Sequence, residues 1–206
     1  MDIKRATFIT SLPRYAPYPG IGLPEVAIAG KSNVGKSSMI NCLCTRNKLA
    51  KVSGTPGKTR LLNIFRLNDD LHLVDLPGYG FARVPKAEQQ RWAQMMEGYF
   101  AESVLLRHVL HLVDMRHEPT GEDRGMQEFL RATGLPCTVV ATKADKLSKA
   151  QRAKQVHRIC RALLVQPWEV LGFSSETGEG RDGVLGVLGS LVKGDAEAVP
   201  EEGLGV

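Results

Sequence analysis

The segment from Gly30 to Ser37 reads GKSNVGKS and constrains the fold of this chain more than any other feature. It lies between a short apolar run with β-branched residues, residues 25–29, and a stretch typical of a helix, residues 36–44. A GxxxxGK[ST] sequence between a strand and a helix predicts a loop whose backbone amides surround phosphate groups at the start of that helix. The sequence therefore predicts a nucleotide-binding phosphate loop over residues 30–37.

Each residue type in the phosphate loop has a physical reason. Gly30 and Gly35 allow backbone angles that other residues avoid, so successive amides can point at the phosphates. Lys36 supplies a compact positive charge for the β and γ phosphates, and Ser37 supplies a hydroxyl oxygen of the kind that Mg²⁺ prefers. A chance glycine turn before a helix is the alternative, and the flanking strand and helix disfavour it. The predicted nucleotide contacts are Gly30, Lys31, Ser32, Asn33, Val34, Gly35, Lys36 and Ser37.

Length and hydrophobic patterning bound the rest of the architecture. The 206 residues are 43% hydrophobic, which suffices for one sizeable core. Residues 62–67 and 71–74 are expected to pair as a hairpin, and strands then alternate with helical segments. This alternation predicts an α/β fold with right-handed crossovers and a mostly parallel sheet covered by helices on both faces.

The two ends of the chain differ in composition from the middle. Proline and glycine break the second half of the first 24 residues, so we expect an N-terminal arm over residues 1–22. A nucleotide-binding domain is expected over residues 23–193, followed by an acidic disordered tail over residues 194–206.

Apolar stretches and cysteines indicate a cellular compartment. No apolar stretch approaches the roughly 20 residues that a membrane span needs. The first residues also lack the apolar region of a secretory signal, so we expect a cytoplasmic protein with no membrane partner. The four cysteines include no CxxC pair, which indicates neither a zinc site nor a disulfide framework.

The sequence TKAD, residues 142–145, follows a predicted strand and bears on the choice of base. Asp145 can accept hydrogen bonds from the ring NH and the exocyclic amino group of guanine, whereas adenine does not offer this pair of donors. Lys143 can lay its alkyl chain over the base. Because a buried carboxylate without partners is costly, such a site rejects adenine. On its own, the tetrapeptide could also be an ordinary charged loop.

Two further segments are typical of a loop that senses the nucleotide. The sequence DLPG from Asp75 to Gly78 follows another predicted strand, where a carboxylate can hold magnesium through water and a glycine amide can contact the γ phosphate. Thr55 and Thr59 lie in a polar loop, and the hydroxyl of either one could close over the metal. A backbone contact to the guanine oxygen is expected from Ser174, Ser175 and Glu176.

Together these segments resemble one family, the EngB (YihA, YsxC) GTPases of the TrmE-Era-EngA-EngB-Septin-like superfamily, and the resemblance spans roughly residues 23–192. These GTPases act in bacterial assembly of the large ribosomal subunit. The segments that carry the resemblance are GKSNVGKS, TPGKTR at residues 55–60, DLPGYGFA at residues 75–82, TKADK at residues 142–146 and SSETGEG at residues 174–180.

The resemblance implies a P-loop NTPase G domain with a six-stranded sheet and five main helices. It implies GTP or GDP as ligand, Mg²⁺ held by Ser37 and Thr59, and Lys36, Ser37 and Thr59 as the catalytic residues. It selects Thr59 over Thr55 as the switch threonine. Beyond the phosphate loop it implies nucleotide contacts from Gly57, Lys58, Thr59, Arg60, Leu61, Asp75, Leu76, Pro77, Gly78, Thr142, Lys143, Ala144, Asp145, Ser174, Ser175 and Glu176.

Three positions refine this expectation. The guanine motif usually begins with asparagine, whereas this chain has Thr142, so specificity should depend on Asp145 and the nucleotide affinity should be modest. Tyr79 follows Gly78 where Ras-like GTPases have a glutamine, which predicts slow intrinsic hydrolysis. Asn33 matches an asparagine that helps to bind K⁺ in related GTPases, and a loop-capping role is its alternative. A K⁺ ion or a partner would then supply the missing charge.

The charge of the chain indicates a polyanionic partner. The formal net charge is +5, and all four charged residues after residue 194 are acidic, so the body is more basic still. The resemblance favours ribosomal RNA of a large-subunit precursor over a merely solvated face, and we expect a monomer. The competing function is a P-loop enzyme that transfers phosphate to a small acceptor, which should lack the guanine residues. The basic residues concentrate at Lys143, Lys146, Lys149, Arg152, Lys154, Arg158 and Arg161.

Overall fold

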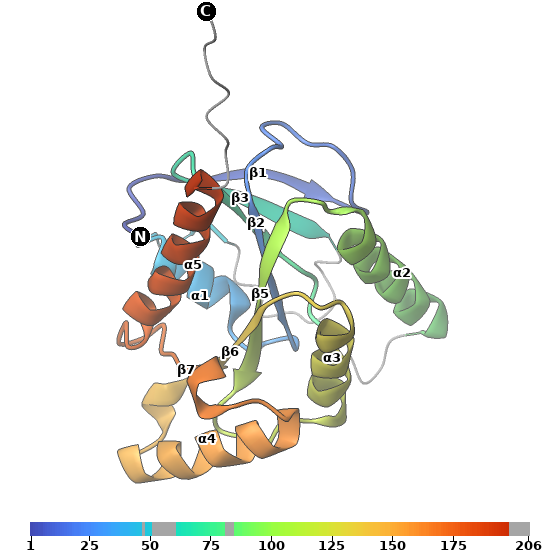
Figure 1. The fold of residues 1–206 in the computed structure, drawn as a ribbon. Coiled ribbons are helices and arrows are strands. Elements are labelled where there is room, and N and C mark those ends of the chain that lie inside the picture. Colours follow the sequence, from blue (N-terminus) through green and yellow to red (C-terminus); the bar gives the residue numbers. More distant parts are fainter. Residues whose placement is uncertain (47, 51–60, 81–84, 198–206) are drawn as a thin grey trace, which may run out of the picture.

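The computed structural model describes residues 1–46, 48–50, 61–80 and 85–197 (Figure 1). Thr55, Thr59 and most of the predicted switch segment around them lie outside the described residues. The strands are β1 (Ala6–Leu12), β2 (Glu25–Gly30), β3 (Leu62–Leu67), β4 (Leu71–Asp75), β5 (Leu106–Asp114), β6 (Cys137–Thr142) and β7 (Val170–Gly172). The helices are α1 (Lys36–Leu43), α2 (Lys86–Glu102), α3 (Gly121–Ala132), α4 (Lys149–Leu163) and α5 (Arg181–Glu197), with short 3₁₀ turns η1 (Ala144–Lys146) and η2 (Pro167–Glu169).

The strands form one mixed sheet in the order β1-β3-β4-β2-β5-β6-β7. Strands β1, β3 and β4 pair antiparallel, and the other neighbours pair parallel. The predicted hairpin of β3 and β4 is confirmed, and it turns at Asn68, whose φ of 51° is one that asparagine tolerates. The sheet has seven strands, so the expectation of six is wrong.

The additional strand is β1, which lies within the segment expected to be an arm. It pairs along β3 at the edge of the sheet, with partners 50 to 61 residues away in sequence, and its side chains are mostly exposed or half-buried. Such a strand has little of the hydrophobic alternation that marks a half-buried strand, and its partner is distant, so local patterns do not reveal it. No helix or strand lies between Leu12 and Glu25, as the prolines predicted.

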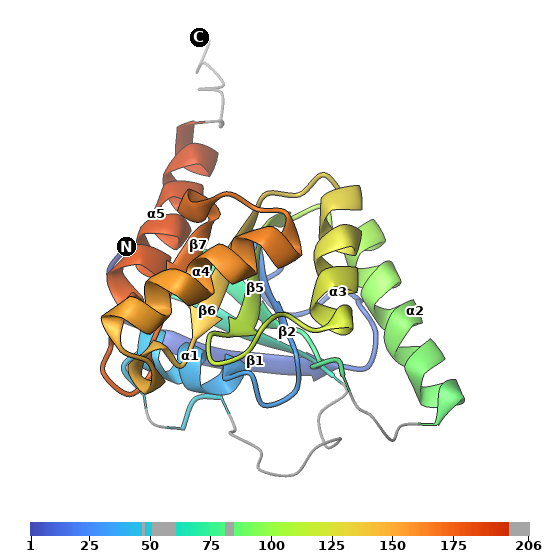
Figure 2. The same ribbon diagram turned by 90° about the horizontal axis from the view of Figure 1, so that it is seen from below.

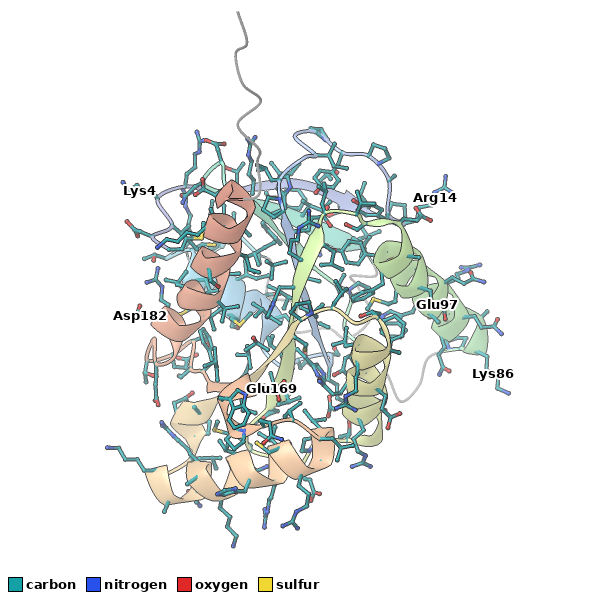
Figure 3. All side chains as sticks on the ribbon, viewed as in Figure 1. Lys4, Arg14, Lys86, Glu97, Glu169 and Asp182 are labelled. Carbon is teal, nitrogen blue, oxygen red and sulfur yellow. The ribbon has the colours of Figure 1, made fainter. Side chains whose placement is uncertain are left out.

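Helices cover both faces of the sheet, as predicted (Figures 1 and 2). The side chains of α1 and α5 pack with one face of the central strands, and those of α2, α3 and α4 pack with the other. Strand β2 is buried along its whole length, which agrees with a parallel strand covered on both sides. Charged side chains such as Lys86, Glu97 and Asp182 point away from the sheet (Figure 3).

Several element ends differ from their predicted positions. Helix α5 extends to Glu197, four residues into the segment expected to be a disordered tail, and residues 198–206 are outside the described part of the chain. The last strand begins at Val170 rather than Trp168, because residues 167–169 form a 3₁₀ turn started by Pro167. None of the helices in the described residues is long and apolar enough to cross a membrane.

The topology brings the predicted site together at one edge of the sheet. Strand β2 has a parallel neighbour on each side, β4 and β5. The loop after β2 therefore lies at the point of the sheet where the strand order reverses, which is where open α/β sheets bind ligands. The carboxyl ends of β2, β4, β5, β6 and β7 all open toward this edge because these strands run parallel. The segments that follow these strands are the ones in which the sequence predicted nucleotide contacts.

Candidate functional site

The phosphate loop leads from β2 directly into α1. Gly35 stands before the helix with a φ of 111°, in the left-handed region that glycine adopts without strain. The loop closes on itself through a hydrogen bond from the Val34 amide to the Lys31 carbonyl at 3.1 Å. Lys36 Nζ points back into the loop and donates to the Gly30 carbonyl at 3.4 Å. The loop thus holds an ammonium group inside a ring of backbone, as phosphate binding requires.

Asp75, at the end of β4, faces this ammonium group from the neighbouring strand. The side chain is buried, and burial raises its pKa to about 6 against the opposing influence of Lys36 and a hydrogen bond with Asn63. Burial lowers the pKa of Lys36 in turn, while the Asp75 carboxylate acts in the opposite direction. Burial therefore disfavours the charged form of both groups, and the attraction between their opposite charges offsets part of that cost.

The oxygens near Lys36 fit a magnesium site. Within the described residues, Asp75 Oδ1 is buried and has no hydrogen-bond partner. An unpartnered buried carboxylate oxygen is costly, and a hydrated Mg²⁺ ion would satisfy it. Ser37 would supply the direct hydroxyl ligand predicted from the sequence, with Asp75 acting through water. Thr59, the second predicted ligand, lies outside the described residues.

The segment after Asp75 lies against the phosphate loop. The Ser32 amide donates to the Tyr79 carbonyl at 2.9 Å, and Lys31 and Tyr79 form an isolated parallel bridge. A side chain on Gly78 would come within 2.9 Å of the Ser32 nitrogen and 3.0 Å of Lys36 Nζ. Only glycine fits here, which explains physically why the DLPG segment ends in this residue.

Lys143 joins the guanine side of the site to the phosphate side. Its Nζ donates to the Asn33 carbonyl at 2.9 Å and to Asp114 Oδ2 at 2.8 Å. Burial raises the pKa of Asp114, but hydrogen bonds from Arg116 and Lys143 outweigh burial and hold this pKa below its ordinary value. Asp114 therefore stays ionised and fixes the lysine. The sequence analysis missed this aspartate, which ends β5 directly opposite Thr142 in the register of the sheet.

Thr142 makes a second bridge to the phosphate loop. Its hydroxyl lies 2.7 Å from the Val34 carbonyl of the phosphate loop and 3.1 Å from the Val113 carbonyl of β5, so its one proton is shared between these two oxygens. We expected the shorter side chain to weaken a supporting contact. The structure shows that the threonine hydroxyl still reaches the phosphate loop from the end of β6.

Asp145 follows in η1 and is oriented by its neighbours. Ser174 Oγ donates to Asp145 Oδ1 at 2.7 Å, and Lys146 Nζ lies 2.9 Å from Oδ2. Hydrogen bonds from Lys146 and Ser174 lower the pKa of Asp145, so the group is an ionised acceptor. Ser174 is fully buried, and its hydroxyl also accepts the Glu176 amide at 3.2 Å. The sequence predicted only a backbone role for residues 174–176; the structure adds Ser174 as the residue that holds Asp145.

Comparison with known proteins agrees with this geometry. The family model described as "50S ribosome-binding GTPase" matches residues 25–143, more than half of the chain. Probable GTP-binding protein EngB of Exiguobacterium sp. is 47% identical over 193 residues, covering 93% of this chain and 98% of the relative. The protein of the same name from Bacillus subtilis is 44% identical over 193 residues, covering 93% and 99%. The chain belongs to the EngB family.

Solved structures show the same fold. The crystal structure of a probable GTP-binding protein EngB has a TM-score of 0.70 at 22% identity and covers 82% of this chain and 98% of that chain. The structure of Era in complex with MgGDPNP and nucleotides of 16S ribosomal RNA has a TM-score of 0.58 at 23% identity and covers 83% and 56%. This EngB-family chain is therefore a GTP-binding P-loop protein with the α/β fold of the GTPase G domain.

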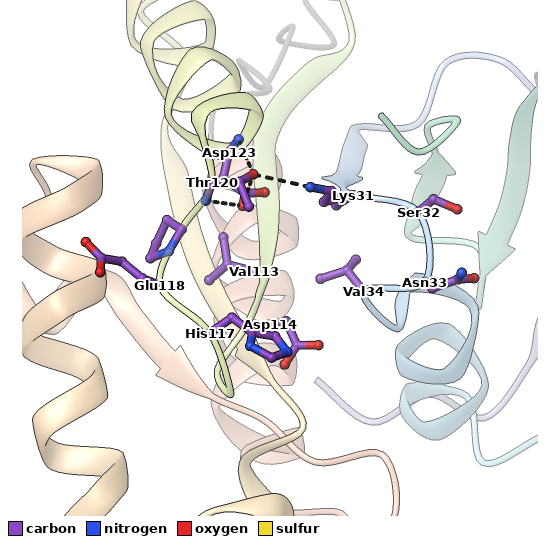
Figure 4. A pocket seen from close by; sticks show the side chains of 11 residues that line it. Lys31, Ser32, Asn33, Val34, Val113, Asp114, His117, Glu118, Thr120 and Asp123 are labelled. Carbon is purple, nitrogen blue, oxygen red and sulfur yellow. Dashed lines mark hydrogen bonds between the residues drawn. The ribbon is translucent and has the colours of Figure 1, made fainter. Parts of the chain in front are cut away.

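A cavity of about 200 Å³ opens beside the phosphate loop of this EngB-family protein (Figure 4). It lies between the first half of the loop and the segment that joins β5 to α3. Lys31 crosses it and pairs with Glu122 at 3.2 Å and with the Thr120 hydroxyl at 3.5 Å. Lys36 and Asp145 do not line the cavity, so it flanks the predicted nucleotide site rather than filling it.

The predicted residues divide into two groups. Those of the phosphate loop, the DLPG segment, the TKAD segment and Ser174 to Glu176 converge on one edge of the sheet, and Leu61 lies half-buried just before β3. The second group, for which the structure describes no position, comprises Gly57, Lys58, Thr59 and Arg60.

Proposed function

We propose that this protein is a slow GTPase that acts as a nucleotide-dependent switch in assembly of the large ribosomal subunit. The observation that carries the proposal is the direct attachment of the TKAD loop to the phosphate loop through Thr142 and Lys143, with Asp145 held ionised beyond them. This arrangement offers one site for phosphates and guanine together. The description of the matching family as ribosome-binding supports the large ribosomal subunit as the partner.

The residues of the chain have separable roles in hydrolysis. Lys36 and the phosphate-loop amides stabilise charge on the transferring γ phosphate, and Gly78 lies beside them. Bound Mg²⁺ would neutralise phosphate charge, held by Ser37, by Thr59 and through water by Asp75. Tyr79 occupies the position of the water-orienting glutamine, and its hydroxyl is buried away from solvent. The chain thus supplies electrostatics without a water-positioning amide at this position, which accounts for slow turnover.

A monovalent ion is the proposed source of additional charge. Asn33 is exposed at the tip of the phosphate loop with a φ of 62°, and its carbonyl is already bonded to Lys143. Its side-chain oxygen is therefore the group available to a K⁺ ion beside the phosphates. We expect GTP hydrolysis to be faster in K⁺ than in Na⁺ at equal ionic strength.

Helix α4 is the proposed contact with ribosomal RNA. Its sequence contains five Lys or Arg residues and no Asp or Glu. Arg152 is held by Glu179 at 2.6 Å, but no ion pair is found in the described residues for Lys149, Lys154, Arg158 or Arg161, which are exposed. A solvated helix face normally mixes charges of both signs, whereas a row of unpaired cations suits phosphate groups. We propose that the protein is a cytoplasmic monomer that docks through this face.

Cosedimentation with ribosomal subunits tests the proposal. Binding should favour large-subunit precursors, differ between GDP, a GTP analogue and no nucleotide, and weaken steeply between about 50 and 200 mM salt. Binding that changes with neither the nucleotide state nor the salt concentration would contradict the proposal. The alternative function is transfer of phosphate to a small acceptor. An enzyme of that kind should lack the TKAD segment and Ser174, which are assembled beside the phosphate loop in this structure.

A further inference from the structure

The side chain of Tyr79 is buried in a polar cluster that the reaction scheme above does not use. Only 6% of the residue is exposed, although it follows Gly78 directly. Its hydroxyl lies 2.8 Å from His111 Nε2 on β5 and 2.8 Å from Asp123 Oδ1 at the start of α3. The other oxygen of Asp123 accepts the amide and the hydroxyl of Thr120, each at 2.8 Å. The cluster therefore ties the DLPG segment to the central strand and to a helix cap.

The partners of His111 fix the direction of donation in this cluster. His111 Nδ1 donates to the Gln127 carboxamide oxygen, so Nε2 of the neutral ring is an acceptor. The single phenol proton of Tyr79 is therefore shared between His111 Nε2 and the Asp123 carboxylate oxygen. Burial lowers the pKa of His111 and raises that of Tyr79, so the ring and the phenol stay neutral. The Gln127 carboxamide lies 2.7 Å from the other ring nitrogen of His111 and fixes the ring plane. Each buried polar group around the phenol has a partner, which makes the side chain a rigid anchor.

This anchor determines where the neighbouring backbone lies. With its side chain held, Tyr79 presents its carbonyl to the Ser32 amide at 2.9 Å. Gly80 has a φ of 79°, and a side chain there would come within 2.5 Å of Lys31 Cε. A side chain on Gly78 would likewise come within 2.9 Å of the Ser32 nitrogen and 3.0 Å of Lys36 Nζ. Residues 78–80 thus lie flat on the phosphate loop, and the one side chain among them points away into the protein.

We propose that Tyr79 is a positioning residue, whose buried hydroxyl holds the Gly78 amide at the γ-phosphate end of the site. The inference deepens the proposed GTPase function and depends on it. It explains why a buried phenol can stand where Ras-like proteins have glutamine: the side chain acts on the backbone rather than on the attacking water. Removing the hydroxyl should weaken interactions with the γ phosphate and leave those with the diphosphate unchanged.

Trp92 provides a local optical signal for this segment. Its indole Nε1–H donates to the Pro77 carbonyl at 3.0 Å, and its ring centroid lies 6.3 Å from that of Tyr79. The other tryptophan, Trp168, is 78% exposed in the 3₁₀ turn η2 and can be replaced by phenylalanine at little cost. In a Trp168→Phe background, fluorescence then reports the DLPG segment alone.

The experiment compares Tyr79→Phe with Tyr99→Phe in that background. Tyr99 is a matched control because it is also buried and its hydroxyl also donates to a carboxylate, Glu25 Oε2, at 2.9 Å. For Tyr79→Phe we expect single-turnover GTP hydrolysis and GTP-analogue affinity to fall about tenfold, with GDP affinity changed less than twofold. The Trp92 response to the analogue should shrink. Tyr99→Phe should lose similar stability in urea without changing the preference for triphosphate.

Other results would overturn the inference. Tyr79 would be an ordinary core residue if both variants changed the triphosphate preference equally, or if Tyr79→Phe weakened GDP and analogue alike. If Tyr79→Phe fails to fold, Asp123→Asn replaces it, since this change removes the charge that holds the hydroxyl, and a smaller fall in the same direction is expected. A wild-type protein that hydrolyses no GTP would refute the proposed function itself, whereas active wild type with an equally active Tyr79→Phe would refute this inference alone.

Discussion

Two aspartates of the site have opposite electrostatic surroundings. Asp145 is surrounded by donors, and hydrogen bonds from Lys146 and Ser174 lower its pKa. Asp75 is buried with one unpartnered oxygen, and its pKa is raised to about 6. The first is stabilised as an acceptor for a base, whereas the second is costly until something binds it. The two residues therefore respond differently to the same change of carboxylate into amide.

Replacing Asp145 by asparagine should change the base preference. An amide offers one donor in place of an acceptor, which suits the C2 oxygen of xanthine and leaves the amino group of guanine unpaired. We expect the affinity for GDP to fall on the order of 100-fold and the affinity for XDP to rise, measured by competition binding. Ser174→Ala, which removes only the 2.7 Å support of Asp145, should weaken both nucleotides modestly. An unchanged preference for guanine in Asp145→Asn would refute the assignment.

Replacing Asp75 by asparagine should stabilise the nucleotide-free protein while impairing nucleotide binding. Because the folded pKa is raised from 3.8 to about 6, the ionised side chain destabilises the fold at pH 7.5 by up to about 3 kcal/mol. This cost is complete well above pH 6, shrinks as the pH falls from 6 toward 3.8, and is absent below 3.8, where the carboxyl is protonated in both states. Urea unfolding at pH 7.5 and pH 4.5 measures the difference. Equal stability of wild type and variant at pH 7.5 would contradict this account.

At the scale of elements, the loops after β2 and β6 form one unit with the helix that follows them. Thr142 and Lys143 bond to the phosphate loop, and Ser148 starts α4 as a cap whose hydroxyl accepts the Gln151 amide. Arg152 pairs with Glu179 in the segment that carries Ser174. The basic helix is thereby attached to the TKAD loop and to the segment that carries Ser174. A partner that docks on α4 could therefore shift these loops and change nucleotide binding.

Charge reversal on α4 tests this docking surface. In the double variant Lys154→Glu with Arg158→Glu, binding to large-subunit particles should weaken at least tenfold and the slope of log affinity against log salt should become shallower by about two. Nucleotide affinity should stay unchanged, because neither side chain contacts the site. The control is Lys4→Glu with Arg14→Glu, which changes the net charge equally in the N-terminal segment (Figure 3). Equal losses in the two double variants would show non-specific attraction only.

At the scale of the whole molecule, function and anchoring occupy opposite ends of the sheet. The proposed nucleotide contacts follow the carboxyl ends of the parallel strands, whereas Glu25 begins β2 at the other end. This fully buried carboxylate accepts hydrogen bonds from the hydroxyl groups of Tyr15 and Tyr18 in the N-terminal segment. It also accepts hydrogen bonds from Tyr99 on α2 and from Ser103 directly after that helix. The cluster fastens residues 13–24 to the domain without any regular structure in them.

Replacing Glu25 by glutamine should destabilise the fold without affecting the nucleotide site. The amide nitrogen cannot accept, so two of the four hydroxyl groups lose their acceptor, which costs roughly 2–4 kcal/mol in urea unfolding. Glu97→Gln on the exposed face of α2 is the matched control and should change stability by less than about 0.5 kcal/mol (Figure 3). A proportional fall in GDP affinity for Glu25→Gln would show that the two ends are coupled, contrary to this prediction.

Short local signals determined much of this protein. The phosphate loop, DLPG and TKAD are fixed by residues close in sequence, since backbone angles and strand-to-helix turns are local properties, and the alternation of strands and helices predicted the α/β class. Contacts between distant segments were decided only by the tertiary structure. The edge strand β1, the pairing of Asp114 with Lys143, the hold of Ser174 on Asp145 and the burial of Tyr79 each join residues at least 29 positions apart. Their strength comes from burial and register, which exist only once the sheet is assembled.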